Sequence, residues 1–205
     1  TGFRKSGCPV CSNKKVLAGF NDLQTTHPEL AKEAKFDPTS ITAGSGKKVP
    51  WKCTTHGHEW KSVVASRTGG NNSGCPVCAD KKVLAGFNDL QTMHPDIARE
   101  ADFDPTIAVA GSTVKMPWKC AAHGHTWKAT VDSRTGGHKS GCPVCSNRKV
   151  LAGFNDLQTT HPDTAREADF DPTTVVAGSH SKMPWKCAQH GHRWEANVVD
   201  RTTDR

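Results

Sequence analysis

Hydrophobic residues occur along the chain in short phrases that return three times. The phrase Val-Leu-Ala-Gly-Phe-Asn-Asp-Leu starts at Val16, Val83 and Val150, and Pro-Trp-Lys-Cys starts at Pro50, Pro117 and Pro184. A constant spacing between equal phrases is typical of a repeat protein. We therefore expect three modules, residues 1–67, 68–134 and 135–205, the last with a short C-terminal tail.

The first half of each module predicts short helices, described here for the first copy. Asn21 and Asp22 precede apolar residues and are typical of a helix N-cap. Pro28 ends that helix and suits the first turn of a second helix over residues 28–34. The Asp37-Pro38 pair ends this second helix.

The second half of each module predicts a hairpin, with strands over residues 50–53 and 59–67. Along the second strand, the face of Trp60 and Ser62 stays apolar or small in all three copies. The alternate face, which begins at Glu59, varies freely, so we assign it to solvent or to a ligand. The fold class predicted is a tandem array of small α+β modules, each a short β-hairpin plus short helices.

Composition excludes several classes of protein. Only 35% of the 205 residues are hydrophobic and 6% are aromatic, which is too few for one large core. No run reaches the roughly 18 apolar residues that a membrane span needs, so we expect no membrane partner. The first residue is Thr rather than Met, which is typical of a processed or excised piece.

The cysteines supply the candidate chemistry. All nine belong to the repeat, as one Cys-x2-Cys pair and one hairpin Cys per copy, and each hairpin Cys is followed by histidine. Three thiolates and one imidazole form the closed tetrahedral set of structural zinc, and we expect about three ions. The predicted ligands are Cys8, Cys11, Cys53, His58, Cys75, Cys78, Cys120, His125, Cys142, Cys145, Cys187 and His192.

Two choices stay open. His56 could replace His58 as the ligand, as could His123 and His190 their counterparts, although we favour the second histidine of each His-Gly-His. The hairpin pair could also close with the Cys-x2-Cys pair ahead of it or behind it. Pairing with the loop ahead has the lower entropic cost of loop closure, whereas pairing with the loop behind leaves no ligand unused.

The sequence resembles a family of zinc-ribbon or treble-clef repeats of bacterial and phage proteins, a domain of unknown function. The matching stretches are CPVCSNKKVLAGFNDLQTTHPELAKEA, SGKKVPWKCTTHGHEWKSVVASRT and GCPVC, and they recur across essentially the whole chain. The resemblance implies that a hairpin Cys and the Gly-His histidine bind metal with the following Cys-x2-Cys pair. In this sequence, the ligand sets that the resemblance implies are Cys53, His58, Cys75 and Cys78, and Cys120, His125, Cys142 and Cys145.

The chain departs from this family at two places in each copy. A tryptophan usual after the second helix is replaced by Ala34, and we expect the nearby Phe36 to supply the missing packing. An extra histidine, His56, precedes Gly57. Similar repeats accompany nuclease-like domains, so the resemblance implies nucleic acid and a nuclease-like neighbour by association.

Charge favours a polyanionic partner. The chain has a formal net charge of +7 and a pI near 9.0, and the basic residues gather in the hairpin half of each module. We therefore expect a nucleic-acid-binding array that contacts DNA in preference to RNA. The predicted contacts are Lys48, Lys52, Lys61, Arg67, Lys115, Lys119, Lys128, Arg134, Lys182, Lys186, Arg193 and Arg201.

Two other functions compete with this one. A structural or protein-interaction array would use the same zinc modules without nucleic acid. An enzyme is disfavoured, because Asn21, Asp22 and His27 lack the order of a His-Asn-His nuclease site. Zinc thiolates need a reducing compartment, which favours a cytoplasmic location.

Overall fold

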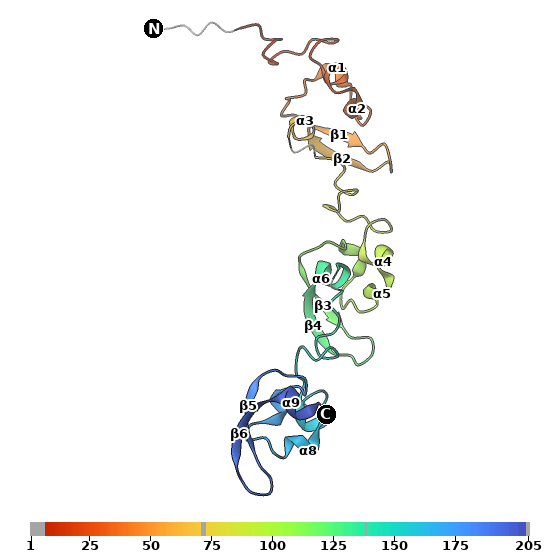
Figure 1. Ribbon diagram of the computed structural model, residues 1–205. Helices are drawn as coiled ribbons and strands as arrows, with labels where there is room; N and C mark the ends of the chain where they lie inside the picture. The colour runs from red at the N-terminus through yellow and green to blue at the C-terminus, as the bar shows by residue number, and fades with distance from the viewer. Residues whose placement is uncertain (1–6, 71–72, 138, 204–205) are drawn as a thin grey trace, which may run out of the picture. The chain divides into compact units, whose positions relative to one another are not determined.

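The computed structural model describes residues 7–70, 73–137 and 139–203, and it repeats one order of elements three times (Figure 1). The chain divides into two compact units, Thr1–Asp89 and Leu90–Arg205. In the first repeat, two short helices and a 3-10 turn precede a two-stranded hairpin, which runs into a third short helix. None of the helices described is long and apolar enough to cross a membrane.

The helices begin where the sequence predicts. Asp22 accepts a hydrogen bond from the backbone N–H of Thr25 at 2.9 Å and caps α1 (Leu23–Thr26). Pro28 opens α2 (Pro28–Ala31), which is shorter than the predicted helix over 28–34, and η1 (Pro38–Ser40) follows. The equivalents are α4 (Leu90–Met93), α5 (Pro95–Ala98), η2 (Pro105–Ile107), α7 (Leu157–Thr160), α8 (Pro162–Ala165) and η3 (Pro172–Thr174).

Each hairpin is an antiparallel pair with two tryptophans opposite each other. In the first repeat, β1 (Lys48–Lys52) pairs with β2 (Glu59–Val63), and Trp51 faces Trp60 across the pair. The same register joins β3 (Lys115–Lys119) to β4 (Thr126–Thr130) and β5 (Lys182–Lys186) to β6 (Arg193–Asn197).

The second strand is shorter than predicted. It ends at Val63, and residues Val64–Thr68 form helix α3 instead of continuing the strand to residue 67. Val64 turns inward to become fully buried, while its N–H bonds the carbonyl of Lys47 at 3.1 Å. The gain from burying this valine outweighs the β propensity of the Val-Val pair. The equivalents are α6 (Val131–Thr135) and α9 (Val198–Thr202).

A small core lies between the helices and one face of the hairpin. Leu23, Trp51 and Val64 are fully buried there. Phe36 meets Trp51 edge to face, with ring centroids 5.3 Å apart, so the predicted compensating packing is confirmed. The indole N–H of Trp51 donates to the carbonyl of Ser62 at 3.1 Å, which satisfies its only buried polar atom. The other repeats build equivalent clusters around Trp118 and Trp185.

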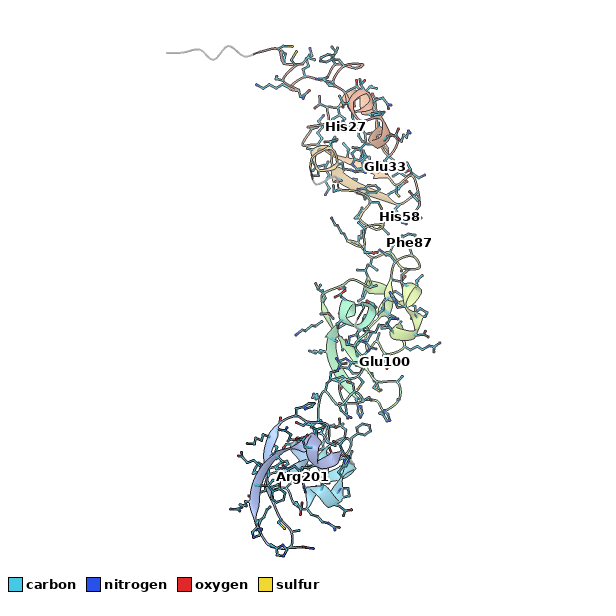
Figure 2. All side chains as sticks on the ribbon, viewed as in Figure 1. His27, Glu33, His58, Phe87, Glu100 and Arg201 are labelled. Carbon is cyan, nitrogen blue, oxygen red and sulfur yellow. The ribbon has the colours of Figure 1, made fainter. Side chains whose placement is uncertain are left out.

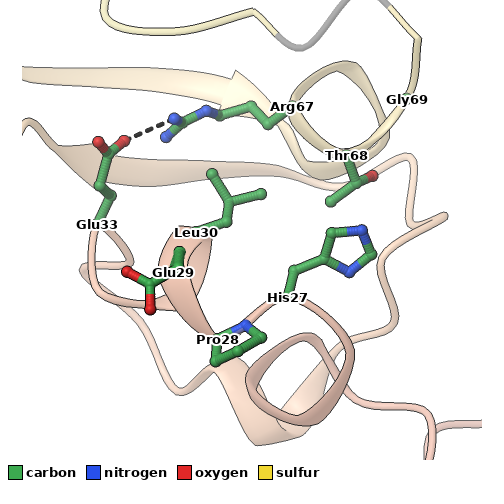
Figure 3. Close-up of a pocket in the computed structure, with 8 residues that line it drawn as sticks. All are labelled: His27, Pro28, Glu29, Leu30, Glu33, Arg67, Thr68 and Gly69. Atoms are coloured by element: carbon green, nitrogen blue, oxygen red, sulfur yellow. Dashed lines mark ion pairs between the residues drawn. The ribbon is translucent and has the colours of Figure 1, made fainter.

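A buried arginine closes this core. Arg67 is only 4% exposed, and its guanidinium lies over the rings of Trp51 and Trp60 at 4.4 and 4.9 Å. It also pairs with Glu33 at 2.6 Å, beside a groove that includes His27 and Thr68 (Figure 3). The expectation that Arg67 contacts phosphate is therefore wrong, because its charge is committed inside the module.

The same correction applies to the other two repeats. Arg134 is 5% exposed, pairs with Glu100 and lies over Trp118. Arg201 is half-buried, pairs with Glu167 and lies over Trp185. An arginine that follows a strand pattern looks exposed in sequence, but helices α3, α6 and α9 turn it back over the tryptophans.

Neutralising Glu100 tests this buried pair. Glu100→Gln leaves the Arg134 guanidinium buried without a counter-charge, and we expect it to destabilise the second repeat by about 3 kcal/mol. Asp96→Asn is the matched control, because its pair with Arg99 at 3.7 Å is highly exposed and contributes little. Hydrogen exchange of the second repeat's amides in the metal-loaded chain would measure both effects, and equal protection in the two variants would contradict this assignment.

Candidate metal centre

The tip of the hairpin holds three candidate ligands close together. Cys53 follows β1, and its N–H donates to the carbonyl of His58 at 2.8 Å. Gly57 donates to the carbonyl of Cys53 at 2.8 Å and has φ of +73°. A positive φ suits glycine because it has no Cβ. This turn therefore presents Cys53, His56 and His58 at one end of the strand pair.

The second group of ligands lies on the Cys-Pro-Val-Cys loop that follows the hairpin. An α-turn-like bond of 3.1 Å runs from the N–H of Ala79 to the carbonyl of Cys75, and Asp80 has φ of +51°. Asn88 fastens the loop, because its side-chain amide donates to the carbonyl of Val77 at 2.9 Å and to Asp80 at 3.0 Å. The asparagine of each Asn-Asp pair therefore shapes the Cys-Pro-Val-Cys loop before it. The interpretation of this residue as a helix cap missed that role.

The two groups meet, and Figure 2 shows His58 beside Phe87 at this junction. The sulfurs of Cys53 and Cys78 are 3.7 Å apart, and His58 Nδ1 lies 3.6 Å from the sulfur of Cys75 and 3.5 Å from that of Cys78. Tetrahedral zinc with ordinary bond lengths would place two sulfurs about 3.8 Å apart and sulfur and nitrogen about 3.5 Å apart. These three separations therefore fit ligands of one zinc ion.

The same arrangement recurs in the second unit. Cys120 Sγ lies 3.6 Å from Cys145 Sγ, and His125 Nδ1 lies 3.6 Å from Cys142 Sγ and 3.7 Å from Cys145 Sγ. These four residues and the group Cys53, His56, His58 and Cys78 are the two clusters found among the described residues that could hold a metal ion.

These contacts answer the question of pairing direction. The first two hairpin pairs meet the Cys-x2-Cys loops ahead of them, so pairing of Cys53 and His58 with the loop behind is not observed. The intervening segment ahead is short, which keeps the entropy of closure low. Within the described residues, Cys8, Cys11, Cys187 and His192 belong to neither cluster, and the predicted third site is not confirmed.

Both histidines of the turn lie near sulfur, but they differ in the number of cysteine sulfurs that lie close to their Nδ1 atoms. His56 Nδ1 lies 3.4 Å from the sulfur of Cys78, whereas His58 Nδ1 is close to both Cys75 and Cys78. The two imidazoles stack at 5.6 Å, and Phe87 packs edge-on against His58 at 4.5 Å. Phe87 thus holds the paired rings over the loop, a packing role that sequence patterns did not reveal.

Burial and neighbouring thiols oppose ionisation of one cysteine in each cluster before metal binds. Burial, followed by the neighbouring thiols of Cys75 and Cys53, raises the pKa of Cys78 to about 12. Burial and the thiols of Cys120 and Cys142 raise the pKa of Cys145 to about 12 as well. A cation that binds these sulfurs must therefore displace protons.

Apart from Arg67, Arg134 and Arg201, the predicted nucleic-acid contacts occupy the outward face of each hairpin. Lys48, Pro50 and Lys52 alternate with the buried positions of β1, and the register places Lys61 opposite Pro50. The equivalents on the other hairpins are Lys115, Lys119, Lys128, Lys182, Lys186 and Arg193, and all are exposed. Lys182 pairs with Glu195, and Arg193 pairs with Asp169.

Comparison with known proteins agrees with this geometry. A family described as a probable treble clef zinc finger domain matches residues 27–81, 96–148 and 161–205. The first two spans include a hairpin and the Cys-Pro-Val-Cys loop ahead of it, which is the pairing that the structure shows. No curated protein matches the chain. Because the three spans together cover most of the sequence, the chain belongs to the probable treble clef zinc finger family.

Proposed function

We propose that each junction holds one structural zinc ion through three cysteines and the second histidine of the His-Gly-His turn. The observation that supports this choice is the position of His58 and His125, each near two sulfurs at 3.5–3.7 Å. The proposed ligand sets are Cys53, His58, Cys75 and Cys78, and Cys120, His125, Cys142 and Cys145.

A set of four protein ligands leaves no position for a substrate, so the proposed metal is structural rather than catalytic. The polar residues once considered for nuclease chemistry also have other roles. Asn21 fastens a loop through the carbonyl of Val10 at 2.9 Å, and Asp22 caps a helix. We propose a non-enzymatic array that works in a reducing compartment such as the cytoplasm, where thiolates persist.

We propose that the array binds the backbone of nucleic acid, with DNA preferred, through the outward faces of its hairpins. The second repeat carries the supporting observation, because this face holds Lys115, Lys119 and Lys128 without an acidic side chain. None of these lysines has an ion pair with another described residue. Their charges are therefore available to phosphates.

One lysine occupies the same place in every repeat, next to the metal-binding turn. The Cε of Lys52 lies 3.8 Å from where a Cβ on Gly57 would stand, and Lys119 and Lys186 lie similarly beside Gly124 and Gly191. The compact turn therefore leaves room for the lysine stem. Because Trp51 is fully buried, phosphate contact rather than base stacking by this tryptophan is the proposed source of affinity.

A structural or protein-interaction array is the second candidate. It is favoured by the same closed zinc sets, which stabilise small modules for many kinds of partner. A nuclease-like neighbouring domain, implied by the family resemblance, is a further proposed partner. Measurable affinity for nucleic acid would distinguish the nucleic-acid-binding array from the protein-interaction array.

Alanine substitutions in one turn test the zinc ligand. We expect His125→Ala to lower zinc affinity at that site by about a hundredfold or more, because the fourth ligand is lost. His123→Ala is the matched control two residues away and should change the affinity much less. Competition with a chromophoric chelator would measure both, and a larger loss in the control would transfer the ligand role to His123.

Zinc affinity should fall as the solution becomes more acidic. The thiols of Cys78 and Cys145, with pKa raised to about 12, carry protons at neutral pH and must lose them on binding. Each site therefore releases at least one proton, and log affinity should fall by at least about 1 for each pH unit between pH 8 and 6.5. Chelator competition across this range measures the slope, and a flat profile would exclude coordination by these thiols.

Two charge-matched triple variants test the nucleic-acid surface. If each repeat makes about two phosphate contacts, log affinity should fall against log salt with a slope near −5 for the unmodified chain. Lys52→Ala, Lys119→Ala and Lys186→Ala together should flatten the slope to about −3 and weaken binding at every sequence. Fluorescence anisotropy with a DNA duplex and an RNA of equal length measures affinity and preference.

The control removes three cations from the opposite, helical side of the modules. Lys32→Ala, Arg99→Ala and Arg166→Ala lose exposed charges that already pair with Glu29, Asp96 and Asp163. This control should retain the slope of the unmodified chain. Equal effects of both triple variants would show that net charge, rather than the hairpin surface, determines binding. No measurable affinity for nucleic acid even at low salt would favour the protein-interaction array.

A further inference from the structure

A groove lies between the second hairpin and the Cys-Pro-Val-Cys loop that follows it. The groove has a volume of about 390 Å³, and its walls include Trp127 and Lys128 from β4 and Arg148 and Lys149 from the end of the loop. Ser140, on the segment between hairpin and loop, also lines it. A volume near the lower end of the usual range for ligand sites suits one small chemical unit.

Hydrogen bonds fix the walls of this groove. The N–H and the hydroxyl of Ser140 both donate to the carbonyl of Ser133, at 2.9 and 2.7 Å. On the loop side, the N–H groups of Arg148 and Lys149 donate to the carbonyl of Pro143 at 2.8 and 2.9 Å. The groove is therefore bounded by hydrogen-bonded backbone and is formed by the folded chain itself.

The groove is strongly basic. Lys128, Arg148 and Lys149 are exposed, and none of them has an ion pair with another described residue. Among the described residues that line the groove, none is acidic. Three cations around one groove without a counter-charge favour an anionic group, and phosphate is the anion that the proposed function supplies.

An indole supplies an apolar wall beside these charges. Trp127 is half-buried, with the guanidinium of Arg134 over its ring at 5.3 Å, and it lines the groove. Trp118, which faces it across the hairpin, is fully buried and is closed to any ligand. Proteins that bind single strands combine a basic groove with aromatic side chains that contact the bases. A planar base can therefore pack against Trp127.

The backbone of β4 adds hydrogen-bonding groups to the groove. Residues 127–129 all line it, so the groove runs along an edge of β4 rather than over one face. This edge has no partner strand in the part of the chain that the structure describes. Pro117, opposite Lys128, directs its carbonyl away from β4 to the N–H of Asp102 at 3.1 Å. By the alternation of an antiparallel pair, the N–H and carbonyl of Lys128 point to the free edge, where they can bond the edge of an unpaired base.

The same residue types recur beside the first hairpin. The equivalents are Trp60, Lys61, Lys81 and Lys82. The third hairpin differs, because Glu195 follows Trp194 where the other hairpins have lysine, and it pairs with Lys182 at 2.9 Å. The sequence signal is a pair of basic residues shortly after the Cys-Pro-Val-Cys loop, which the predicted nucleic-acid contacts did not include.

We propose that this groove, and its equivalent beside the first hairpin, binds one unpaired nucleotide of a single strand of nucleic acid. The phosphate lies among the side chains of Lys128, Arg148 and Lys149, and the base packs against Trp127. This inference rests on the nucleic-acid binding proposed above and names the part of the nucleic acid that is recognised. Affinity then depends on the base as well as on the phosphate.

A single strand of thymidines tests the base contact against an abasic strand of equal length and charge. By fluorescence anisotropy, the zinc-loaded chain should bind the thymidine strand about fivefold or more tightly, because the abasic strand cannot stack on an aromatic ring. Equal affinities would overturn the groove and leave phosphate binding by the hairpins intact. No affinity for either strand at low salt would overturn both proposals. A glutamate-rich peptide that competes as well as the thymidine strand would also contradict a nucleotide site.

Photo-crosslinking locates the contact. A strand with iodouracil in place of thymine should form adducts on Trp127 and Trp60, which mass spectrometry of the peptides would identify. Trp194 is the internal control, because it occupies the same place in a hairpin that has Glu195 instead of lysine. It should react about fivefold less or weaker still, since the positive wall is lost. Adducts on Trp194 as abundant as those on Trp127 would contradict the proposal.

Removing two cations from one groove tests the phosphate contact. Arg148→Ala with Lys149→Ala should lower the adduct on Trp127 about fivefold or more relative to the adduct on Trp60, which is the reference within the same chain. A constant ratio, with the zinc content of the unmodified chain, would overturn the assignment of the phosphate to these cations.

The control removes two cations from the helical side of the modules. Arg99→Ala with Arg166→Ala loses exposed charges that already have acidic partners, so the ratio of the two adducts should stay unchanged. Lys128→Ala repeats the test from the opposite wall without touching the loop, and it decides the outcome if the loop variant loses zinc. An unchanged ratio in Lys128→Ala would then count against the groove.

Discussion

The structure depends on the tips of the first two hairpins meeting the Cys-Pro-Val-Cys loops that follow them. The chain has too few hydrophobic residues for a large shared core, and each repeat buries only a small cluster around one tryptophan. Where the first hairpin meets the loop after it, the separations Cys53–Cys78, Cys75–His58 and Cys78–His58 are those of a tetrahedral metal site. Cys53 lies on the hairpin tip and Cys78 on the loop after it, and a small apolar cluster that includes Val77, Trp60 and Phe87 packs at the same place.

The small core of each repeat prepares one half of that donor set. Trp51 and Val64 fasten the hairpin to the helices, while Arg67 stacks on the tryptophans and pairs with Glu33. The hairpin tip that carries Cys53 and His58 is therefore held by a strand pair that packs firmly against the helices. The opposite half is prepared separately, because Asn88 holds the loop by its own hydrogen bonds. Ordering both halves beforehand lowers the conformational entropy lost when a metal binds.

Local signals predicted much of this arrangement. The cap at Asp22, the hairpin, the cysteines and the packing of Phe36 on Trp51 follow from short patterns, and the structure agrees. The direction of pairing did not follow from residue types, because both directions offer the same ligands. The burial of Arg67 was missed because it depends on helix α3 replacing the end of a strand, a choice made by tertiary packing.

Each candidate donor set lies within one span of the family match, and this has a consequence for cooperativity. Residues 27–81 contain the first hairpin and the loop with Cys75 and Cys78, and residues 96–148 contain the second hairpin and the loop with Cys142 and Cys145. A metal bound at either set would close that unit on itself rather than join it to the next one. Loss of metal from one unit would then leave the donor set of the other unit unchanged.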